Sequence, residues 1–452
     1  MPEIAKCQIL PSYFFRYTKS LMNKIKTGFE GLHRRYDTGI FRKEKILGDV
    51  DVWIQEPPIV TSEAGVIIAL WKRVGAWRDP AGKEGLAHFF EHIPFTGTRD
   101  FPDRDKLFHT INEMGGAMNA ATGVIMTNYY VVSPKNTFQE AAHIVSELAL
   151  RPLVREEDID KERGIILSEY RRRYSNNDIY TSEKIEQAFW KEHPLGKRAI
   201  GTPEGIGSVY AEDMREFQKN YYQSGNLVLF VGGAFSERKD ILEIASKEFE
   251  DVVRGPESPS WPPMPFNNSD EILLEGEEYL RSQIYMRWMF PVGNTADALR
   301  QSYIASTLSR ALTEDRDSPL PSIIREKMGL AYETKYSFGG ADSDSIDFGG
   351  IIKVPFKDLN VVQGVFMDCL KKLNADEIVK NIRRAQVARA MNYTDSVNAV
   401  HNAVDDVLDY GRPISYWEAE SMRDAISPDE VLALRDRVLA VKPWICRVHG
   451  KN

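Results

Sequence analysis

The sequence is poor in cysteine and contains no long apolar run. Its 452 residues include three cysteines, Cys7, Cys369 and Cys446. Their odd number and wide spacing exclude a disulfide framework and a thiolate metal site. The longest apolar runs, such as 66–71 and 227–232, are far shorter than the roughly 18 residues that a membrane-spanning helix needs. The sequence therefore predicts no membrane span, and runs of this length are typical of buried strands.

The sequence also shows no secretory signal and no excess of basic charge. The first residues, MPEIAKCQILPSYFF, lack a basic segment followed by a clean apolar core and a small-residue cleavage site. Lysine and arginine total 58 against 66 aspartate and glutamate, which gives a formal net charge of −8. This charge argues against nucleic acid as a partner. We therefore expect a cytoplasmic protein that binds no nucleic acid.

Length and composition predict a globular protein with more than one domain, because 452 residues exceed the size of one ordinary core. Residues 1–45 form a basic extension with ten Lys/Arg against four Asp/Glu. A docked helix, a partner-binding arm and a mobile segment all fit this extension. A linker is predicted at 253–268, because helices and sheets exclude so many prolines: Pro256, Pro259, Pro262, Pro263 and Pro265. It separates a domain at 46–252 from one at 269–452.

The two predicted domains end in similar patterns. Residues 211–233 read as a helix followed by a strand that finishes in Val-Gly-Gly, and residues 428–450 read as a helix followed by a strand that finishes in Val-His-Gly. This is a weak sign of internal duplication, and it agrees with the position of the linker.

A candidate metal site lies in the segment GLAHFFEHIPFTGT, which begins at Gly85. The pattern predicts a helix over about 85–97, in which His88 and His92 share one face and can reach a single ion. Glu91 lies on the same side, where it can act as a base toward a metal-bound water. The alternative is a helix with two solvent-facing histidines and an unrelated glutamate. Pro94 is expected to end the helix early.

A catalytic zinc needs about three protein ligands, so a third must come from elsewhere. A helix predicted over about 156–174 places Glu162 and Glu169 two turns apart on one face. One of these carboxylates can complete the metal site, while the other can orient a histidine or the water. The alternative is a solvated charged face, which we prefer for Glu156, Glu157 and Asp158.

With this spacing the chain resembles the pitrilysin/insulinase family of zinc peptidases. That family carries an inverted H-x-x-E-H motif followed by a glutamate about 76 residues later, which here is Glu169. The resemblance implies that His88, His92 and Glu169 bind one Zn²⁺ per chain. It further implies that Glu91 is the general base and that Glu162, in the family's E-x6-E pair, supports the site.

The segment 114–130, MGGAMNAATGVIMTNYY, has a composition that suits an exposed edge strand with small side chains. Such an edge can bind an extended peptide through main-chain hydrogen bonds. Without the resemblance, an ordinary glycine-rich hairpin is the simpler interpretation. The resemblance favours a substrate-docking strand that includes Asn119 and Ala120. An acidic position often seen in this strand is apolar here, at Val124 or Ile125, which leaves side-chain preferences open.

The segment 321–336, PSIIREKMGLAYETKY, contains Arg325 and Tyr332 seven residues apart. Without the resemblance they read as a surface charge and a core aromatic. The family carries such an Arg/Tyr pair in its second half. A guanidinium and a phenol are suitable donors to the carbonyl oxygen of a peptide bond under attack.

We therefore predict an α+β fold of two similar domains, each a largely antiparallel sheet with helices packed on one face. The predicted function is that of a zinc metalloendopeptidase acting on peptides or short unfolded polypeptides. The resemblance also implies pairing, either as a homodimer or as a heterodimer with a paralogous chain, with Arg325 and Tyr332 of one chain completing the site of the other. The alternative is a non-catalytic or partner-dependent subunit of a peptidase-like complex.

Overall fold

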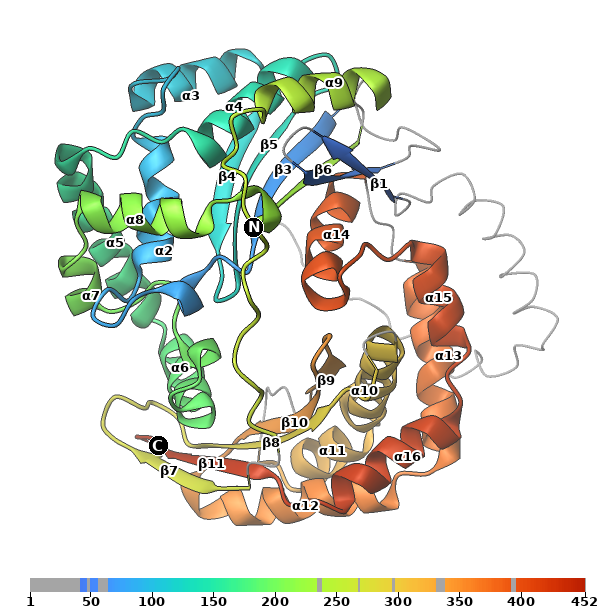
Figure 1. The fold of residues 1–452 in the computed structure, drawn as a ribbon. Coiled ribbons are helices and arrows are strands. Elements are labelled where there is room, and N and C mark those ends of the chain that lie inside the picture. The colour runs from blue at the N-terminus through green and yellow to red at the C-terminus, as the bar shows by residue number, and fades with distance from the viewer. Residues whose placement is uncertain are drawn as a thin grey trace, which may run out of the picture.

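The chain folds into two halves, each built on one β-sheet (Figure 1). The computed structural model describes residues 41–46, 49–55, 64–233, 238–266, 269–294, 297–330, 338–391 and 396–451. The first half contains, in chain order, β1 (Phe41–Ile46), β2 (Val50–Gln55), β3 (Ala64–Lys72), α2 (Leu86–His92), α3 (Arg104–Glu113), β4 (Ala117–Thr122), β5 (Met126–Pro134), α4 (Phe138–Leu150), α5 (Glu156–Tyr174), α6 (Asn177–Trp190), α7 (Pro203–Gly207), α8 (Ala211–Tyr221), β6 (Leu227–Gly233) and α9 (Arg238–Glu248).

The second half begins after an irregular segment at 253–266. It contains β7 (Glu271–Glu275), β8 (Gln283–Pro291), α10 (Ala298–Thr313), α11 (Pro319–Pro321), a π-helical turn (Ser322–Lys327), β9 (Phe338–Ala341), β10 (Ser345–Lys353), α12 (Leu359–Lys372), α13 (Ala375–Met391), α14 (Ser396–Tyr410), α15 (Tyr416–Asp424), α16 (Pro428–Leu439) and β11 (Trp444–His449).

The two sheets share one topology. The first has the strand order β1-β2-β6-β3-β5-β4, and the second has the order β7-β11-β8-β10-β9. When β1 is set aside, each sheet contains one parallel pair, β2/β6 or β7/β11, followed by antiparallel pairs. This confirms the predicted α+β fold of two similar halves. One boundary differs from the sequence prediction, because residues 41–45 of the expected extension belong to β1; residues 1–40 lie outside the described part.

The central strands of each sheet are buried on both faces, which explains their continuous apolar pattern. In β3, Ile67, Ala69 and Trp71 face the helices of the first half, including α2, α4 and α8. The alternate residues, Val66 and Ile68, belong to a separate apolar cluster with residues of α14. This helix of the second half lies beside the first sheet (Figure 1).

The two halves exchange one helix each. α14 places an apolar stripe, Val400, Ala403, Val404 and Val407, on the open face of the first sheet. In return, α6 places Ile185, Phe189 and Trp190 on Tyr285, Met289 and Trp444 of the second sheet. Each sheet thus carries its own helices on one face and a single helix of the other half on the opposite face. The linker predicted at 253–268 stays a prediction. Each sheet packs against a helix from the other side of this segment, so the packing joins the two halves.

A buried ion-pair network fastens α6 to the second sheet. Arg287 of β8 donates to both oxygens of Asp347, at 3.0 and 2.6 Å, and to Glu186 of α6 at 2.8 Å. Its guanidinium also lies 4.2 Å from the ring centroid of Phe189. The neighbouring anions raise the pKa of Arg287 despite burial, so it stays charged. A buried cation with all of its partners in place specifies this packing.

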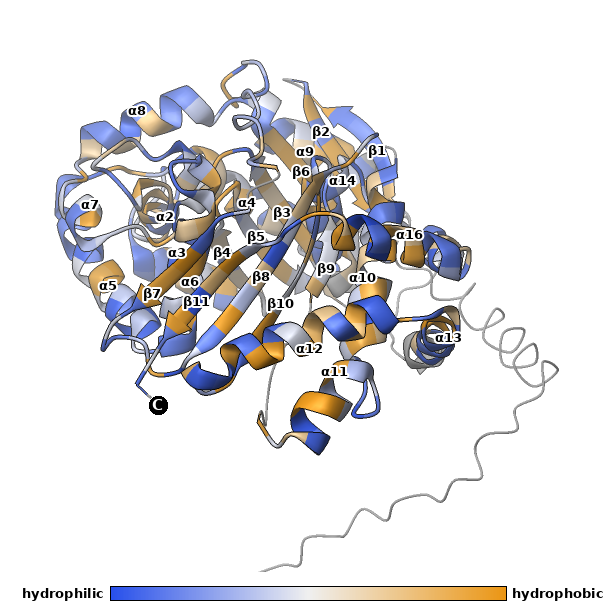
Figure 2. Cartoon of the chain, turned by 90° about the horizontal axis from the view of Figure 1, so that it is seen from below, coloured by the Kyte–Doolittle hydropathy of each residue, from blue (hydrophilic) through white to orange (hydrophobic). Residues whose placement is uncertain are grey.

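Hydrophilic residues alternate with hydrophobic ones along the outer helices, whereas long stretches of the strands are hydrophobic (Figure 2). Among the residues that the structure describes, no helix is both long and apolar enough to cross a bilayer.

Candidate metal centre

The motif helix α2 is anchored at its start by a remote carboxylate. Asp79 accepts hydrogen bonds from the backbone N–H groups of Gly85, at 2.7 Å, and Ala87, at 2.9 Å. Gly85 precedes the helix with φ +102°, a conformation that favours glycine. α2 ends at His92, and Pro94 lies in the following 3-10 turn, so the helix ends early as expected.

The structure brings the three predicted ligands together. Nε2 of His88 lies 3.9 Å and Nε2 of His92 lies 3.7 Å from Oε2 of Glu169. One ligand atom from each residue lies within 4.8 Å of the others. Two imidazole nitrogens and one carboxylate oxygen are a donor set that zinc accepts in catalytic sites. The residues present therefore fit a zinc ion.

Glu162, the second carboxylate of α5, contacts the ring nitrogen of His92 that does not face Glu169. Oε2 of Glu162 lies 3.2 Å from Nδ1 of His92, so that a proton on Nδ1 can be donated to the carboxylate. This contact leaves Nε2 of His92 available toward Glu169. Oε1 of Glu162 accepts from Arg104 at 3.3 Å. The arrangement favours Glu169 as ligand and Glu162 as support, a choice that the spacing alone left open.

Burial sets the electrostatics of the site. It lowers the pKa of His88 to about 3, with the neighbouring charges of His92 and Arg173 adding to the effect, so His88 offers a neutral ligand nitrogen. Burial also raises the pKa of Glu91 to about 7, although interactions with Thr122 oppose the rise. Oε2 of Glu91 is buried and has no hydrogen-bond partner among the described residues. A buried carboxyl that titrates near neutrality can both accept and return a proton.

For His92, burial lowers the pKa, but the hydrogen bond with Glu162 and the charges of Glu91 and Glu169 raise it by more, so that the net shift is upward. The site therefore holds one histidine that is readily neutral and one that is surrounded by carboxylates. A divalent cation would compensate this concentration of negative charge.

The predicted docking strand is β4, which lies at an edge of the first sheet. The hydrogen bond from Gly123 N–H to Met126 C=O, at 2.8 Å, fixes the ladder at the turn. Because hydrogen-bonded and non-hydrogen-bonded pairs alternate, Ala120 and Thr122 direct their backbone groups to the open edge. The N–H of Ala120 is bonded to Oδ1 of Asn119 at 2.9 Å.

The other outer edge of the same sheet is different. β1 carries Arg42, Lys43, Glu44 and Lys45, whereas β4 reads Ala-Met-Asn-Ala-Ala-Thr and carries no charge. Charged side chains on an edge strand prevent another chain from adding to it. β4 is thus an open, uncharged edge that adjoins α2 and Glu91.

Within one chain, Arg325 of the predicted Arg/Tyr pair lies in the half opposite to the proposed ligands His88, His92 and Glu169. Arg325 lies in the π-helical turn of the second half, with its side chain 43% exposed and its Nε 3.5 Å from Glu326. The preceding helix α11 and the motif helix α2 lie in opposite halves of the molecule (Figure 1). Tyr332 lies outside the described residues.

Sequence reasoning missed two residues that hold this site, Asp79 and Arg104. Asp79 acts on α2 from a loop six residues before Gly85, and Arg104 reaches Glu162 from another helix. Both contacts depend on tertiary structure. For Asp79 the sequence offers one signal: a carboxylate six residues before Gly85, which has no side chain to cap the helix. For Arg104 it offers none.

A second cluster, Asp100, His143 and Glu147, also has ligand atoms within 4.8 Å of one another. Its buried carboxylate is already used, because Glu147 accepts from Arg99 and from the N–H of Asp100 and pairs with Arg151 at 3.3 Å. Two guanidinium groups at this carboxylate identify an ion-pair network rather than a metal site.

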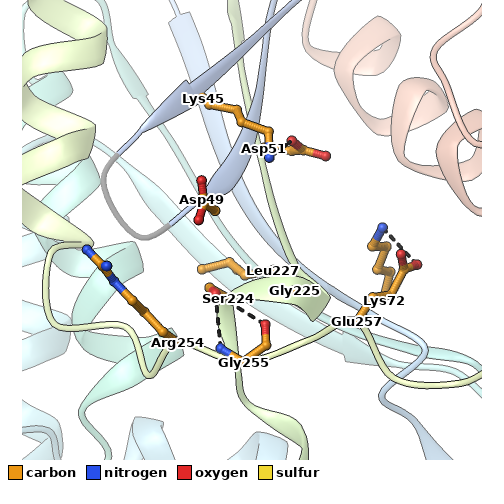
Figure 3. A pocket seen from close by; sticks show the side chains of 10 residues that line it. All are labelled: Lys45, Asp49, Asp51, Lys72, Ser224, Gly225, Leu227, Arg254, Gly255 and Glu257. Atoms are coloured by element: carbon orange, nitrogen blue, oxygen red, sulfur yellow. Dashed lines mark hydrogen bonds and ion pairs between the residues drawn. The ribbon is translucent and has the colours of Figure 1, made fainter.

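A surface pocket of about 300 Å³ lies between the β1–β2 turn and the segment that follows α9 (Figure 3). Its charges are of both signs, and Lys72 pairs with Glu257 at 3.0 Å. Ser224 and Gly255 bond to each other across its floor. None of His88, Glu91, His92, Glu162 and Glu169 lines this pocket.

The fold is thus one of two similar α+β halves, and the first half carries a two-histidine, one-carboxylate group that could hold a metal ion. The profile of the Insulinase (Peptidase family M16) domain matches residues 54–203, and that of the Peptidase M16 inactive domain matches residues 208–391. The chain belongs to the insulinase family of peptidases, as its motif spacing predicted.

Relatives agree with this assignment. An uncharacterized zinc protease of Streptomyces coelicolor is 23% identical over 411 residues, which span 90% of this chain and 88% of the relative. The mitochondrial-processing peptidase subunit beta of Saccharomyces cerevisiae is 22% identical, spanning 95% of this chain and 93% of its own length. A solved structure of a protease from Helicobacter pylori has a TM-score of 0.76 and 17% identity, covering 91% of this chain and 99% of that one. That likeness shows a shared fold.

Proposed function

We propose that this chain is a zinc metalloendopeptidase that hydrolyses peptides or short unfolded polypeptides. The observation that carries the proposal is the convergence of His88, His92 and Glu169 from two helices, with Glu91 on the same face. Membership of the M16 family and the zinc-protease names of relatives support it. A cytoplasmic location stays a prediction from the sequence.

His88, His92 and Glu169 would hold one zinc ion per chain. Zinc bound there supplies Lewis-acid polarisation of a water and of the scissile carbonyl. Glu162 keeps the imidazole of His92 oriented through Nδ1, at 3.2 Å. Such outer contacts fix the ring and increase the basicity of the ligand nitrogen.

Glu91 is the proposed general base. Its carboxylate accepts a proton from the attacking water and delivers it to the nitrogen of the leaving amine, so no covalent enzyme intermediate forms. Its environment suits both steps, because burial raises the pKa of Glu91 to about 7.

The substrate is proposed to add to β4 as an extended strand. Ala120 directs its N–H and C=O groups to the open edge, whereas the backbone of Thr122 also bonds to Glu91. Main-chain hydrogen bonds of this kind tolerate many peptide sequences. A bound peptide carbonyl would replace Oδ1 of Asn119 at the N–H of Ala120, where that side chain now lies at 2.9 Å.

Arg325 and Tyr332 are proposed to complete the site of a second chain, as donors to the scissile carbonyl oxygen. The position of Arg325 in the half that lacks the metal residues supports an arrangement between chains. The partner is a second copy or a paralogous chain. A partner-dependent or non-catalytic subunit is the second candidate, and it is favoured by the relative that is named as a subunit.

Zinc content and cleavage of a mixed peptide library, for wild type beside Glu91→Gln, test the proposal. We expect about one zinc per chain in both proteins and cleavage by wild type alone. Zinc without any cleavage in wild type would favour the partner-dependent subunit. A wild-type protein without zinc would contradict the metal site.

The arrangement between chains has its own test. Chains with Glu91→Gln are mixed with chains that carry Arg325→Ala and Tyr332→Phe. If the pair acts across the interface, the mixture regains activity, because a chain with an intact zinc site meets a partner with an intact pair. A mixture that stays inactive contradicts this arrangement.

A further inference from the structure

The buried carboxylate of Glu162 has two anchors. Oε2 meets Nδ1 of His92 at 3.2 Å, and Oε1 accepts from Nη1 of Arg104 at 3.3 Å. In the part of the chain that the structure describes, these are the interactions of the Glu162 side chain, which is only 6% exposed. One oxygen therefore serves the histidine and the other serves the arginine.

A carboxylate with a single anchor is poorly oriented. The terminal torsion of a glutamate is broad, so one contact does not fix the plane of the carboxylate. Without Arg104, Oε1 of Glu162 would be a buried, charged acceptor with no partner, which is unfavourable. The group would turn toward water, and its contact with His92 would weaken.

Arg104 is itself held in place. It is the first residue of α3, whose preceding residue Asp103 accepts from the N–H of Lys106 at 2.8 Å and so fixes the helix start. The guanidinium of Arg104 lies 5.2 Å from the ring centroid of Phe108, one turn along the helix. The two contacts direct a half-exposed side chain toward Glu162.

We infer that Arg104 is a positioning residue of the metal centre: it orients Glu162, which in turn holds His92 with Nε2 directed at the ion. The chain of contacts runs from α3 through α5 to α2 and joins three helices at the site. The inference rests on the proposed metal site, but it does not require peptidase activity.

A simple charge effect predicts the opposite result. Removing a cation near a Zn²⁺ site lessens repulsion. If Arg104 acted only through its charge, its removal would therefore strengthen zinc binding. A positioning arginine strengthens binding. The sign of the change in zinc affinity therefore separates the two roles.

The test measures zinc affinity of the full chain by competition with a chromogenic chelator, so it does not depend on turnover. Arg104→Met keeps the aliphatic stem, and we expect zinc binding about 10-fold weaker, the lower end of the 10–100-fold effect of outer-shell residues. Lys106→Met is the matched control, since it removes a cation from the same helix without touching Glu162; its affinity should stay unchanged. Arg104→Lys should lie between wild type and Arg104→Met.

A double-variant cycle locates the effect. In a Glu162→Gln background, the loss caused by Arg104→Met should disappear, because the residue through which it acts is altered. Zinc binding by Arg104→Met as tight as by Lys106→Met overturns the inference, and so does a loss that persists in the Glu162→Gln background. A wild-type protein that binds zinc but cuts no peptide contradicts the proposed function and leaves this inference standing.

Discussion

The two halves of the molecule share a fold but differ in chemistry. Their sheets have the same strand order once β1 is set aside. α5 and α13 occupy equivalent places in the chain order, because each follows a hairpin, β4/β5 or β9/β10, and one further helix, and each precedes the exchanged helix. The buried Ile159 of α5 can be matched with the buried Ile378 of α13. Glu162 then aligns with Asn381, which is likewise buried. The helix packing is retained, whereas the carboxylate is not.

The same holds seven residues further on. The position of Glu169 corresponds in sequence to Ala388, so the second helix has no carboxylate at either place. α10, which lies between β8 and β9 as α2 lies between β3 and β4, contains no histidine and no acidic residue. Because the second half has the same fold without these groups, the fold does not require them, and the proposed zinc site belongs to the first half.

Replacing Glu169 of α5 with alanine, the residue at the matched position of α13, is the substitution with the largest expected effect. Glu169→Ala should abolish zinc binding and peptide cleavage, because the site would keep only two histidines. The fold should persist, since the side chain is one-third exposed and α13 has an alanine at the matched position in the sequence. Zinc analysis and circular dichroism check the two expectations. A variant that retains zinc would contradict the role of Glu169 as a ligand.

Glu91→Gln separates the base from the metal. The amide keeps the shape of the side chain but cannot accept the water's proton, so kcat/KM should fall by about 10²–10⁴-fold while zinc is retained. Steady-state kinetics with a peptide substrate measure the fall. Activity within about threefold of wild type would show that another group takes the proton.

The sequence predicted local structure well because the signals were local. The acidic residues at its start and the three arginines at its end gave α5 with the bounds that the structure has, 156–174. The i, i+4 spacing placed His88 and His92 on one face. The uncharged strand at 117–122 is an edge strand, which its composition suits, and it forms a hairpin with β5, the interpretation that the residues alone favoured. These features depend on backbone period and side-chain type alone.

The packing of helices on the sheets and the contacts between helices depend on which surfaces meet in the tertiary structure. The apolar stripe of α14 indicates a buried face, but nothing in it specifies the first sheet rather than the second. For the same reason the sequence predicted helices on one face and could not place the exchanged helix on the other. The contact between Arg104 and Glu162 joins residues 58 positions apart on separate helices, and no spacing encodes it.

The exchanged helices should make the two halves unfold together. Phe189→Ala in α6 removes a buried ring from the second sheet, and we expect a loss of about 3–5 kcal/mol in the free energy of unfolding. Calorimetry should show a single transition at a lower temperature, because neither sheet is fully covered without the other half. Two separate transitions would show that the halves fold independently.

The open edge offers a smaller test. Ala120→Pro removes one outward N–H, so kcat/KM should fall by about 2–12-fold, the equivalent of one net hydrogen bond of about 0.5–1.5 kcal/mol. Zinc affinity should not change. Asn119→Ala is the matched variant, because it uncovers the same N–H; KM should stay equal or fall. If both variants raise KM alike, the side chain of Asn119 contacts the peptide directly.

The two exchanged helices differ in their dependence on pH. α6 is fastened by the buried Arg287 network, whereas α14 carries Asp409, whose pKa is raised to about 7 by burial and by the nearby charges of Asp342, Asp405 and Asp406. A carboxyl whose folded pKa exceeds its ordinary value of 3.8 stabilises the fold at low pH. That contribution is lost as the pH rises through about 7.

Asp409→Asn should therefore raise Tm relative to wild type by more at pH 8 than at pH 5, by about 2–4 °C. Asp368→Asn, an exposed substitution on α12, is the control and should show the same Tm difference at both pH values. An equal effect of the two substitutions would mean that α14 is not the pH-sensitive helix. A larger effect of Asp409→Asn at pH 8 would show that the stability contributed by α14, the helix on the first sheet, falls as Asp409 ionises.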